Sequence, residues 1–318
     1  MQFIVSNQTE PYWNISVENY LVEHADAVVL YLWRNRRTVV IGQNQNPFSE
    51  CNVEALEADG GYLMRRKTGG GAVYHDDGNL NFSFVVPKAL YDQTRQFSVI
   101  QRAVESFGLH TELSGRNDIL AEGRKFSGNA FSKGRINDLH HGTLLIKGDM
   151  SDLARYLRPK PAKLQKHGVQ SVRSRVVNLA ELNPEITPES IAFRLKEAFF
   201  SEYSEYSECS EYSDYSEIIK ISEVKRLHDH FASPEWKYGR WRTFTAQRTG
   251  QFDWGGVELA LTVDEARGVI TDVQIASDAL DLAALDEART VLTGASTATP
   301  PMHEPNPILD DILSLVYE

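Results

Sequence analysis

The stretch YLMRRKTGGGAVYHDDGNLNFSFVV, residues 62–86, decides how this chain is expected to fold. Residues 62–66 and 72–75 predict two short strands, one on each side of a glycine run. The letters DDGN that follow have the composition of a hairpin turn. Residues 80–86 alternate as a returning strand with two phenylalanines on one face, because side chains two apart point the same way. The stretch therefore predicts a β-hairpin that follows a glycine-rich loop.

Three consecutive glycines, Gly69 to Gly71, require a reason, since glycine loses more backbone entropy on folding than any other residue. A backbone without Cβ atoms lets an anionic ligand approach its N–H groups closely. Arg65 and Arg66, directly before the loop, could add matching positive charge. The alternative is a glycine-rich hairpin at a sheet edge with two solvated arginines. The three glycines alone do not decide between these interpretations.

The residues around the glycines give a more specific signal. The run RRKTGGGAVYHD, residues 65–76, followed by GN-x-NF at 78–82, resembles the lipoate-binding loop of the lipoate–protein ligase A family. Apolar residues behind the loop would, by that resemblance, receive the dithiolane tail of lipoate. The resemblance also implies a set of residues that bind ATP or lipoate, namely Arg66, Gly70, Gly71, Ala72, Val73, Tyr74 and Asn79.

A second motif, SGRNDILAEGRKFSGNAF at residues 114–131, contains a lysine and an aspartate with open roles. Taken alone, Lys125 would be a surface charge, because lysines are rarely buried. Asp118 could cap a turn. It could equally bind Mg²⁺, which prefers one or two carboxylates together with phosphate oxygens. Spacing does not separate these roles.

The second motif also resembles the same family, through GRND followed by GRK-x-SG. This resemblance implies that Lys125 is the catalytic residue and that Asp118 lies at the metal and phosphate site. Asn117, which precedes that aspartate, is then expected to contact ATP or lipoate. The two matches are independent of each other, and together they favour the functional interpretation of both motifs.

Two further segments continue the resemblance. LHHGTLLI, residues 139–146, predicts a strand and matches the family motif HHGTLL; His141 could line the acyl pocket or be a hydrogen-bonded structural histidine. KLQKHGVQSVRSRVVNL, residues 163–179, is a basic loop that corresponds in the family to a mobile segment closing over the adenylate. Arg173 in this loop is expected to bind ATP or lipoate. Without the resemblance, the segment would be interpreted as a solvated basic turn.

The composition is that of an ordinary globular enzyme. Hydrophobic residues make up 42% and charged residues 24% of the chain. Its length of 318 residues is enough for two domains. A net charge of −11 argues against a nucleic-acid partner. No apolar run reaches about 18 residues and no signal peptide pattern is found, so no membrane association is expected. Two cysteines, Cys51 and Cys209, provide no disulfide framework and favour a reducing, cytoplasmic location.

The rest of the chain predicts alternating helices and strands. Residues 27–33 and 38–42 are β-branched runs around a polar turn, which predicts a hairpin. Residues 91–107 and 190–203 have helical patterns. The acidic segment SEYSEYSECSEYSDYSEIIKIS, residues 201–222, repeats every three residues and is expected to be a solvated, low-complexity insertion without a catalytic role.

A different unit is predicted from about residue 250. Two strands at 252–262 and 268–275 precede helices at 280–292 and 308–317. This unit resembles the accessory C-terminal domain of the long form of the ligase. The expected organisation is a catalytic domain over residues 1–245, interrupted by the 201–222 insertion, and a C-terminal accessory domain over residues 250–318.

The resemblance implies an α+β fold in which a mixed β-sheet forms the catalytic domain, as in biotin and lipoate ligases, plus a small α+β C-terminal domain. It implies ATP-dependent attachment of lipoate, through lipoyl-AMP, to a lysine of lipoyl-carrier domains, such as 2-oxoacid dehydrogenase E2 and the glycine cleavage H protein. ATP and lipoate are the expected substrates, Mg²⁺ the expected cofactor at Asp118, and a monomer the expected state.

Two other functions compete with this prediction. An octanoyltransferase shares the fold, needs no ATP and often uses a cysteine nucleophile. Cys51 is the candidate, since a helix N-terminus could lower its pKa, although the sequence favours a small buried core residue at this position. Cys209 has acidic neighbours that would raise its pKa. A non-catalytic lipoate-binding relative is the other alternative, and an intact Lys125 argues against it.

Overall fold

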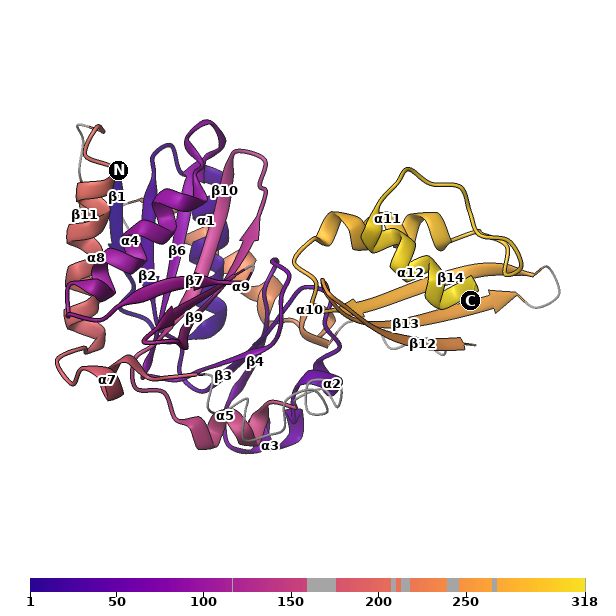
Figure 1. The fold of residues 1–318 in the computed structure, drawn as a ribbon, viewed down its shortest axis with the longest axis horizontal. Helices are drawn as coiled ribbons and strands as arrows, with labels where there is room; N and C mark the ends of the chain where they lie inside the picture. The colour runs from indigo at the N-terminus through magenta and orange to yellow at the C-terminus, as the bar shows by residue number, and fades with distance from the viewer. Residues whose placement is uncertain are drawn as a thin grey trace.

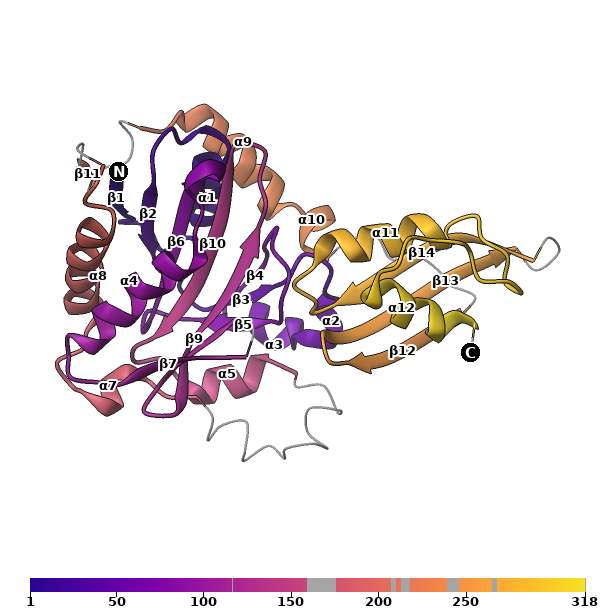
Figure 2. The ribbon, with the colours of Figure 1, turned by 45° about the horizontal axis from the view of Figure 1, so that its top comes forward.

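Figure 1 shows the computed structural model of the protein, which describes residues 1–115, 117–158, 176–206, 210–212, 218–238, 246–264 and 268–317. Two units are visible. The larger one contains two sheets, and the smaller one, the C-terminal unit formed by described residues from 246 onward, lies beside it (Figures 1 and 2). The predicted mixed α+β fold is confirmed.

A mixed sheet is the centre of the larger unit. Within the described residues it has eight strands in the order β11-β1-β2-β6-β10-β9-β8-β7. β1 runs parallel to both of its neighbours, and all other neighbouring strands are antiparallel. The strands are β1 (Gln2–Val5), β2 (Val29–Trp33), β6 (Asn79–Pro87), β7 (Thr111–Ser114), β8 (Asp118–Ala121), β9 (Arg124–Ser132), β10 (Asn137–Leu145) and β11 (Ser210–Tyr212).

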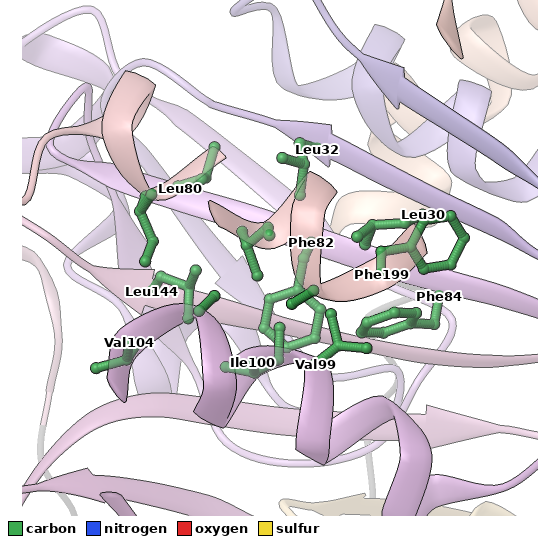
Figure 3. Close-up of a cluster of buried hydrophobic side chains, with 14 of the residues drawn as sticks. Leu30, Leu32, Leu80, Phe82, Phe84, Val99, Ile100, Val104, Leu144 and Phe199 are labelled. Carbon is green, nitrogen blue, oxygen red and sulfur yellow. The ribbon is translucent and has the colours of Figure 1, made fainter. Parts of the chain in front are cut away.

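Helices cover both faces of this sheet. α4 (Gln93–Glu105) and α8 (Pro188–Glu202) pack on one face, and α1 (Pro11–His24) and α9 (Ile221–Ala232) on the other (Figure 2). Figure 3 shows the first of these cores, where Phe82 and Phe84 of β6 lie against Ile100 of α4 and Phe199 of α8. The two phenylalanines therefore share a face, as predicted.

A second, three-stranded sheet has the order β4-β3-β5. β3 runs parallel to β4 and antiparallel to β5. Its strands are β3 (Thr38–Ile41), β4 (Tyr62–Arg65) and β5 (Val73–His75). Residues of α3 (Val53–Ala58) and α5 (Met150–Tyr156) pack against the far side of this small sheet. The remaining short helices are α2 (Pro47–Glu50), η1 (Lys88–Leu90), α7 (Leu179–Leu182) and α10 (Pro234–Tyr238).

Both predicted hairpins are wrong. β2 belongs to the large sheet and β3 to the small one, and the same division separates β5 from β6. Apolar β-branched runs predict that a strand forms but not which strand it pairs with. The turn at Gly78 carries the chain from one sheet to the other, and a Cβ there would lie 2.1 Å from the carbonyl oxygen of Lys147. Glycine is therefore required by close packing at this crossing.

The tyrosine repeat is not solvated at its beginning. Tyr203 is fully buried and its ring lies 5.3 Å from that of Phe199, one helical turn earlier. The guanidinium of Arg95 lies 4.3 Å from the centre of the tyrosine ring. The expectation of a solvated insertion is wrong at this residue because α8 brings the first tyrosine onto its apolar face. Residues 207–209 and 213–217, including Cys209, lie outside the described part.

The C-terminal unit has its own core. Two helices pack on an antiparallel sheet in the order β12-β13-β14. Both predicted helices form, but the predicted strand at 252–262 is divided, since β12 ends at residue 252 and β13 begins at 255. The elements are β12 (Ala246–Phe252), β13 (Gly255–Asp264), β14 (Val269–Ser277), α11 (Leu282–Leu292) and α12 (Pro307–Tyr317).

The catalytic domain is predicted to end at residue 245 and the C-terminal domain to begin at residue 250; because residues 239–245 lie outside the described residues, this boundary stays a prediction. Across the described ranges, none of the helices combines the length and the apolar character needed to cross a membrane.

Candidate active site

A cavity of about 340 Å³ is lined by residues of both sheets of the larger unit and by residues of the C-terminal unit. One part of its lining, which we name the loop wall, consists of Arg66, Gly70, Gly71, Ala72 and Val73. A second part, which we name the strand wall, consists of Asn117, Asp118, Lys125, Gly128 and Asn129 at β8 and β9.

Strand alternation decides which residues of the small sheet reach the cavity. Successive side chains of a strand point to opposite faces, so Val40, Met64 and Val73 line the cavity. Tyr74 points to the far side, where its hydroxyl donates to Oδ2 of Asp152 at 3.0 Å. The side chain of this predicted ligand residue therefore lies outside the lining.

The two arginines before the glycines are buried and hydrogen-bonded to the backbone. Arg66 donates to the carbonyl oxygens of Gly69 at 2.7 Å and Gly71 at 2.8 Å, which ties the glycine loop together. Arg65 donates to the carbonyls of Gln45, at 2.6 Å, and of Trp236 in α10, at 2.9 Å. Burial lowers the pKa of each guanidinium to about 10. Neither arginine is solvated, so the interpretation that predicted two solvated arginines is wrong.

The strand wall has a lysine–aspartate pair in the cavity lining. Nζ of Lys125 lies 2.7 Å from Oδ1 of Asp118, and the two side chains are 34% and 33% exposed. A β-bulge between β8 and β9 sets the register that brings them together. A Cβ at Gly128 would lie 3.2 Å from the same Nζ, so glycine leaves room for the lysine side chain. Asn117 and Asn129 donate to each other's carbonyls, at 2.8 and 3.0 Å, and hold the two strands beside the pair.

His141 of β10 both lines the cavity and is hydrogen-bonded on both ring nitrogens. Nδ1 lies 2.8 Å from Oε2 of Glu18, and Nε2 lies 2.8 Å from Oγ1 of Thr68. The sequence analysis did not identify Glu18 or Thr68. A glutamate within the apolar pattern of α1 was the available signal for Glu18, because a carboxylate on a buried helix face needs a partner.

His75 is a further lining residue that the sequence analysis missed. Burial lowers its pKa to about 3, with smaller contributions from Arg66 and His141, so its imidazole is neutral. The predicted residue Asn79 is buried and donates to Oδ1 of Asn81 at 2.8 Å. Asn81 itself lines the cavity, and Asn79 supports it.

The C-terminal unit reaches the cavity through the segment after β14. Asp278 and Leu280 are part of the lining. Between them, the carbonyl oxygen of Ala279 accepts a hydrogen bond from the backbone N–H of Gly70 at 3.0 Å. No sequence pattern predicted this contact, because it joins residues more than 200 positions apart.

Comparison with known proteins identifies the family. Residues 10–200, more than half of the chain, match the family of the lipoyl protein ligase A/B catalytic domain. The chain belongs to this lipoate–protein ligase family. Residues 242–302 match a second family, the bacterial lipoate protein ligase C-terminus. The predicted family, its enzymatic character and the presence of a C-terminal domain are confirmed.

Individual ligases show how far the similarity extends. Lipoate-protein ligase A of Psychrobacter cryohalolentis is 39% identical over 292 residues, which are 90% of this chain and 86% of that protein. The crystal structure of P. falciparum LipL1 in complex with lipoate has a TM-score of 0.86 at 30% identity and covers 98% of each chain. A lipoate-protein ligase A bound with ATP shares the fold, with a TM-score of 0.60, 23% identity and coverage of 75% of this chain and 98% of that one.

Most of the residues expected from the ligase motifs meet at the cavity. Tyr74 and Asn79 lie behind its lining, as described above. Arg173 and most of the predicted mobile loop, residues 163–175, lie outside the described residues. The residues brought together are Arg66, Gly70, Gly71, Ala72, Val73, Asn117, Asp118, Lys125 and His141.

Proposed function

We propose that this ligase activates lipoate with ATP to lipoyl-AMP and then transfers the lipoyl group to a lysine of a carrier domain. One observation carries the proposal: the Lys125–Asp118 pair lies in the same cavity lining as the glycine loop. A lysine ammonium in the same lining as a glycine-rich backbone suits a reaction in which a carboxylate meets a phosphate. The similarity to ligases solved with lipoate and with ATP supports it.

In the first step, a carboxylate oxygen of lipoate attacks the α-phosphorus of ATP. The bond to the bridging oxygen breaks, and pyrophosphate leaves with its electron pair. Lys125, whose ammonium lies in the lining, stabilises the negative charge that builds up on the phosphoryl oxygens. The loop wall holds the adenylate, with the backbone of Gly70, Gly71 and Ala72 close enough to accept an anionic group.

Asp118 is the residue of the strand wall that would hold Mg²⁺. Within the described ranges, no group of three or more His, Cys, Asp or Glu side chains could bind a metal ion by itself. A single carboxylate fits Mg²⁺ that arrives with ATP, because this ion is bound through one or two carboxylates plus phosphates and water. When bound, it would neutralise phosphate charge.

The apolar part of the lining suits the lipoyl tail. It combines small-sheet residues with residues of α1, β2 and β9, and all of them are buried except Val73, which is partly buried. Burying the hydrocarbon chain there contributes affinity in proportion to the apolar area removed from water. These residues are Ile15, Trp33, Val40, Met64, Val73 and Ala130.

In the second step, the amine of a carrier lysine attacks the carbonyl carbon of lipoyl-AMP. An amide bond forms, AMP leaves with the electron pair, and the amine loses a proton. We propose lipoyl domains of the 2-oxoacid dehydrogenase E2 or glycine cleavage H type as carriers, with the ligase acting as a cytoplasmic monomer.

Release of pyrophosphate from ATP, lipoate and Mg²⁺ in the absence of any carrier tests the proposal. A ligase releases pyrophosphate and forms lipoyl-AMP under these conditions. Transfer of an acyl group from an octanoyl-carrier without ATP, and no lipoate-dependent pyrophosphate release, would instead identify an octanoyltransferase. Lipoate binding without either reaction would identify a non-catalytic relative.

A further inference from the structure

A row of buried polar side chains connects α1 to the glycine loop. Oε2 of Glu18 accepts hydrogen bonds from Oγ of Ser83 at 2.6 Å and from Nδ1 of His141 at 2.8 Å. The other ring nitrogen of His141 lies 2.8 Å from Oγ1 of Thr68, the residue directly before the glycines. Glu18 is 1% exposed and Thr68 is 0% exposed, so solvent does not compete for these hydrogen bonds.

One arrangement of protons satisfies every donor in this row. Nε of Arg66 can only donate, and it donates to Oγ1 of Thr68 at 3.0 Å. The proton of the Thr68 hydroxyl is then available to Nε2 of His141, which can accept it. The imidazole proton then lies on Nδ1 and is donated to the carboxylate of Glu18. In this arrangement every donor of the row has an acceptor.

The row ends on the backbone that shapes the loop wall. Arg66, one member, also donates to the carbonyls of Gly69 and Gly71, and the negative charge of Glu18 partly offsets the cost of burying this guanidinium. Glu18 and Thr68 do not themselves line the cavity, whereas His141, Gly70 and Gly71 do. An effect of Glu18 on a ligand must therefore pass through its neighbours.

We propose that Glu18 is a positioning residue that acts through His141 and Thr68 to hold the glycine loop in the shape that binds the acyl substrate. The proposal rests on the proposed function, since it takes lipoate as that substrate. The row is complete before any substrate arrives. Its loss should therefore weaken lipoate binding more than it slows the chemical step.

Three variants test this, with lipoate affinity from calorimetry and KM and kcat from pyrophosphate release at saturating ATP. Thr68→Val keeps the shape but removes the hydroxyl, and it should raise the Kd and KM for lipoate about tenfold, the equivalent of one buried hydrogen bond, with kcat within about twofold. Thr68→Ser restores the hydroxyl and should return both constants to within about twofold of the parent. Glu18→Gln removes the charge and should raise them about three- to tenfold.

Ser16→Ala is the matched control. Ser16 is also a buried hydroxyl on α1, but it donates to the carbonyl of Tyr12 at 2.5 Å and is not part of the row. Its loss should lower thermal stability without changing lipoate affinity. An equal loss of affinity in Ser16→Ala would show that any weakening of α1 has this effect and would overturn the proposal. Should Thr68→Val fail to fold, the lipoate affinities of Glu18→Gln and Thr68→Ser are compared with that of Ser16→Ala instead.

Nitrogen NMR of His141 provides a readout independent of activity. The row requires a proton on Nδ1 that is donated to Glu18, and a ring with its proton on Nε2 alone would overturn it. Unchanged lipoate affinity in both Thr68→Val and Glu18→Gln, in a parent that binds lipoate and releases pyrophosphate, would overturn the positioning role alone. A parent that binds no lipoate would overturn the proposed function, whatever the state of His141.

Discussion

The loop wall and the strand wall both contain positive charge, but they use it in opposite ways. Arg66 in the loop wall is 7% exposed and directs its guanidinium at carbonyls of its own loop. Lys125 in the strand wall is 34% exposed and has one carboxylate partner in the cavity lining. A charge surrounded by its own backbone fixes a shape, whereas a charge left at a cavity surface can respond to a substrate. The first should be measurable as stability and the second as rate.

Lys125→Ala should give the largest functional effect. Removing one group that stabilises developing charge costs about 10²–10³-fold in rate, so lipoyl-AMP formation should fall by that factor. The melting temperature should hardly change, because a partly exposed ion pair contributes about 0–1 kcal/mol. Pyrophosphate release and thermal unfolding of the same samples measure both. Adenylation at the parental rate would show that the strand wall does not contain the catalytic charge.

Arg66→Leu should give the complementary result, a large loss of stability. The substitution leaves buried carbonyls of Gly69 and Gly71 without their donor, and unpaired buried groups cost about 1–3 kcal/mol each. We expect the free energy of unfolding in urea to fall by about 2–3 kcal/mol. Arg226→Leu, at an exposed arginine of α9, is the control and should stay within about 0.5 kcal/mol of the parent. Equal stability of the two variants would remove the distinction between the walls.

The sequence located candidate residues of the cavity where these lie in short continuous motifs. The glycine loop, Lys125 and Asp118 were named as candidates through the family motifs, because each motif contains them within a few residues, whereas the ion pair between the last two was not predicted. Helical periodicity likewise predicted α4, α11 and α12. Alternation within β5 also distinguishes Val73 from Tyr74, although the family motif treats them alike.

Contacts between distant segments could not be predicted in this way. Strand partners depend on tertiary packing, so β2 and β6 were assigned to hairpins although they pair with each other in the large sheet. Glu18 meets His141 across 123 positions, and no local pattern encodes that distance. Asp278 approaches the cavity only because the C-terminal unit packs against the glycine loop.

His75 provides a pH-dependent test of the small sheet that carries the loop wall. Because burial lowers its folded pKa to about 3 while the unfolded value stays near 6.5, the unfolded chain binds more protons between these values. Stability contributed by neutral His75 is therefore present above pH 6.5 and is lost as the pH falls toward 3. The slope is about 1.4 kcal/mol per pH unit for one histidine. When the free energy of unfolding in urea is measured from pH 7 to pH 4, its slope against pH should be smaller in His75→Asn than in the parent by the contribution of this one histidine. An unchanged slope would show that His75 is charged in the folded protein.

Cys51 should give the smallest effect, and it tests whether the small sheet directs any nucleophile toward the cavity. Its side chain is 1% exposed and belongs to the cluster behind the small sheet, on the side to which Tyr74 points. Burial raises the pKa of the thiol to about 12, so only about one molecule in 10⁴ would carry the thiolate at pH 8. The favoured interpretation of Cys51 as a small buried core residue is confirmed, and burial raises its pKa rather than a helix N-terminus lowering it.

We therefore expect the double variant Cys51→Ser/Cys209→Ser to lipoylate a carrier with ATP at a rate within about twofold of the parent. Between pH 7 and 9 the parent and the double variant should show the same dependence of rate on pH, since the buried thiol does not ionise in that range. Intact-mass spectrometry after incubation with an octanoyl-carrier, and separately with lipoate and ATP, should show no acyl group on the enzyme. An acyl adduct that forms without ATP and is absent from Cys51→Ser would place a nucleophile behind the small sheet. The catalytic role would then move from the strand wall to that side, and the chain would act by acyl transfer rather than by adenylation.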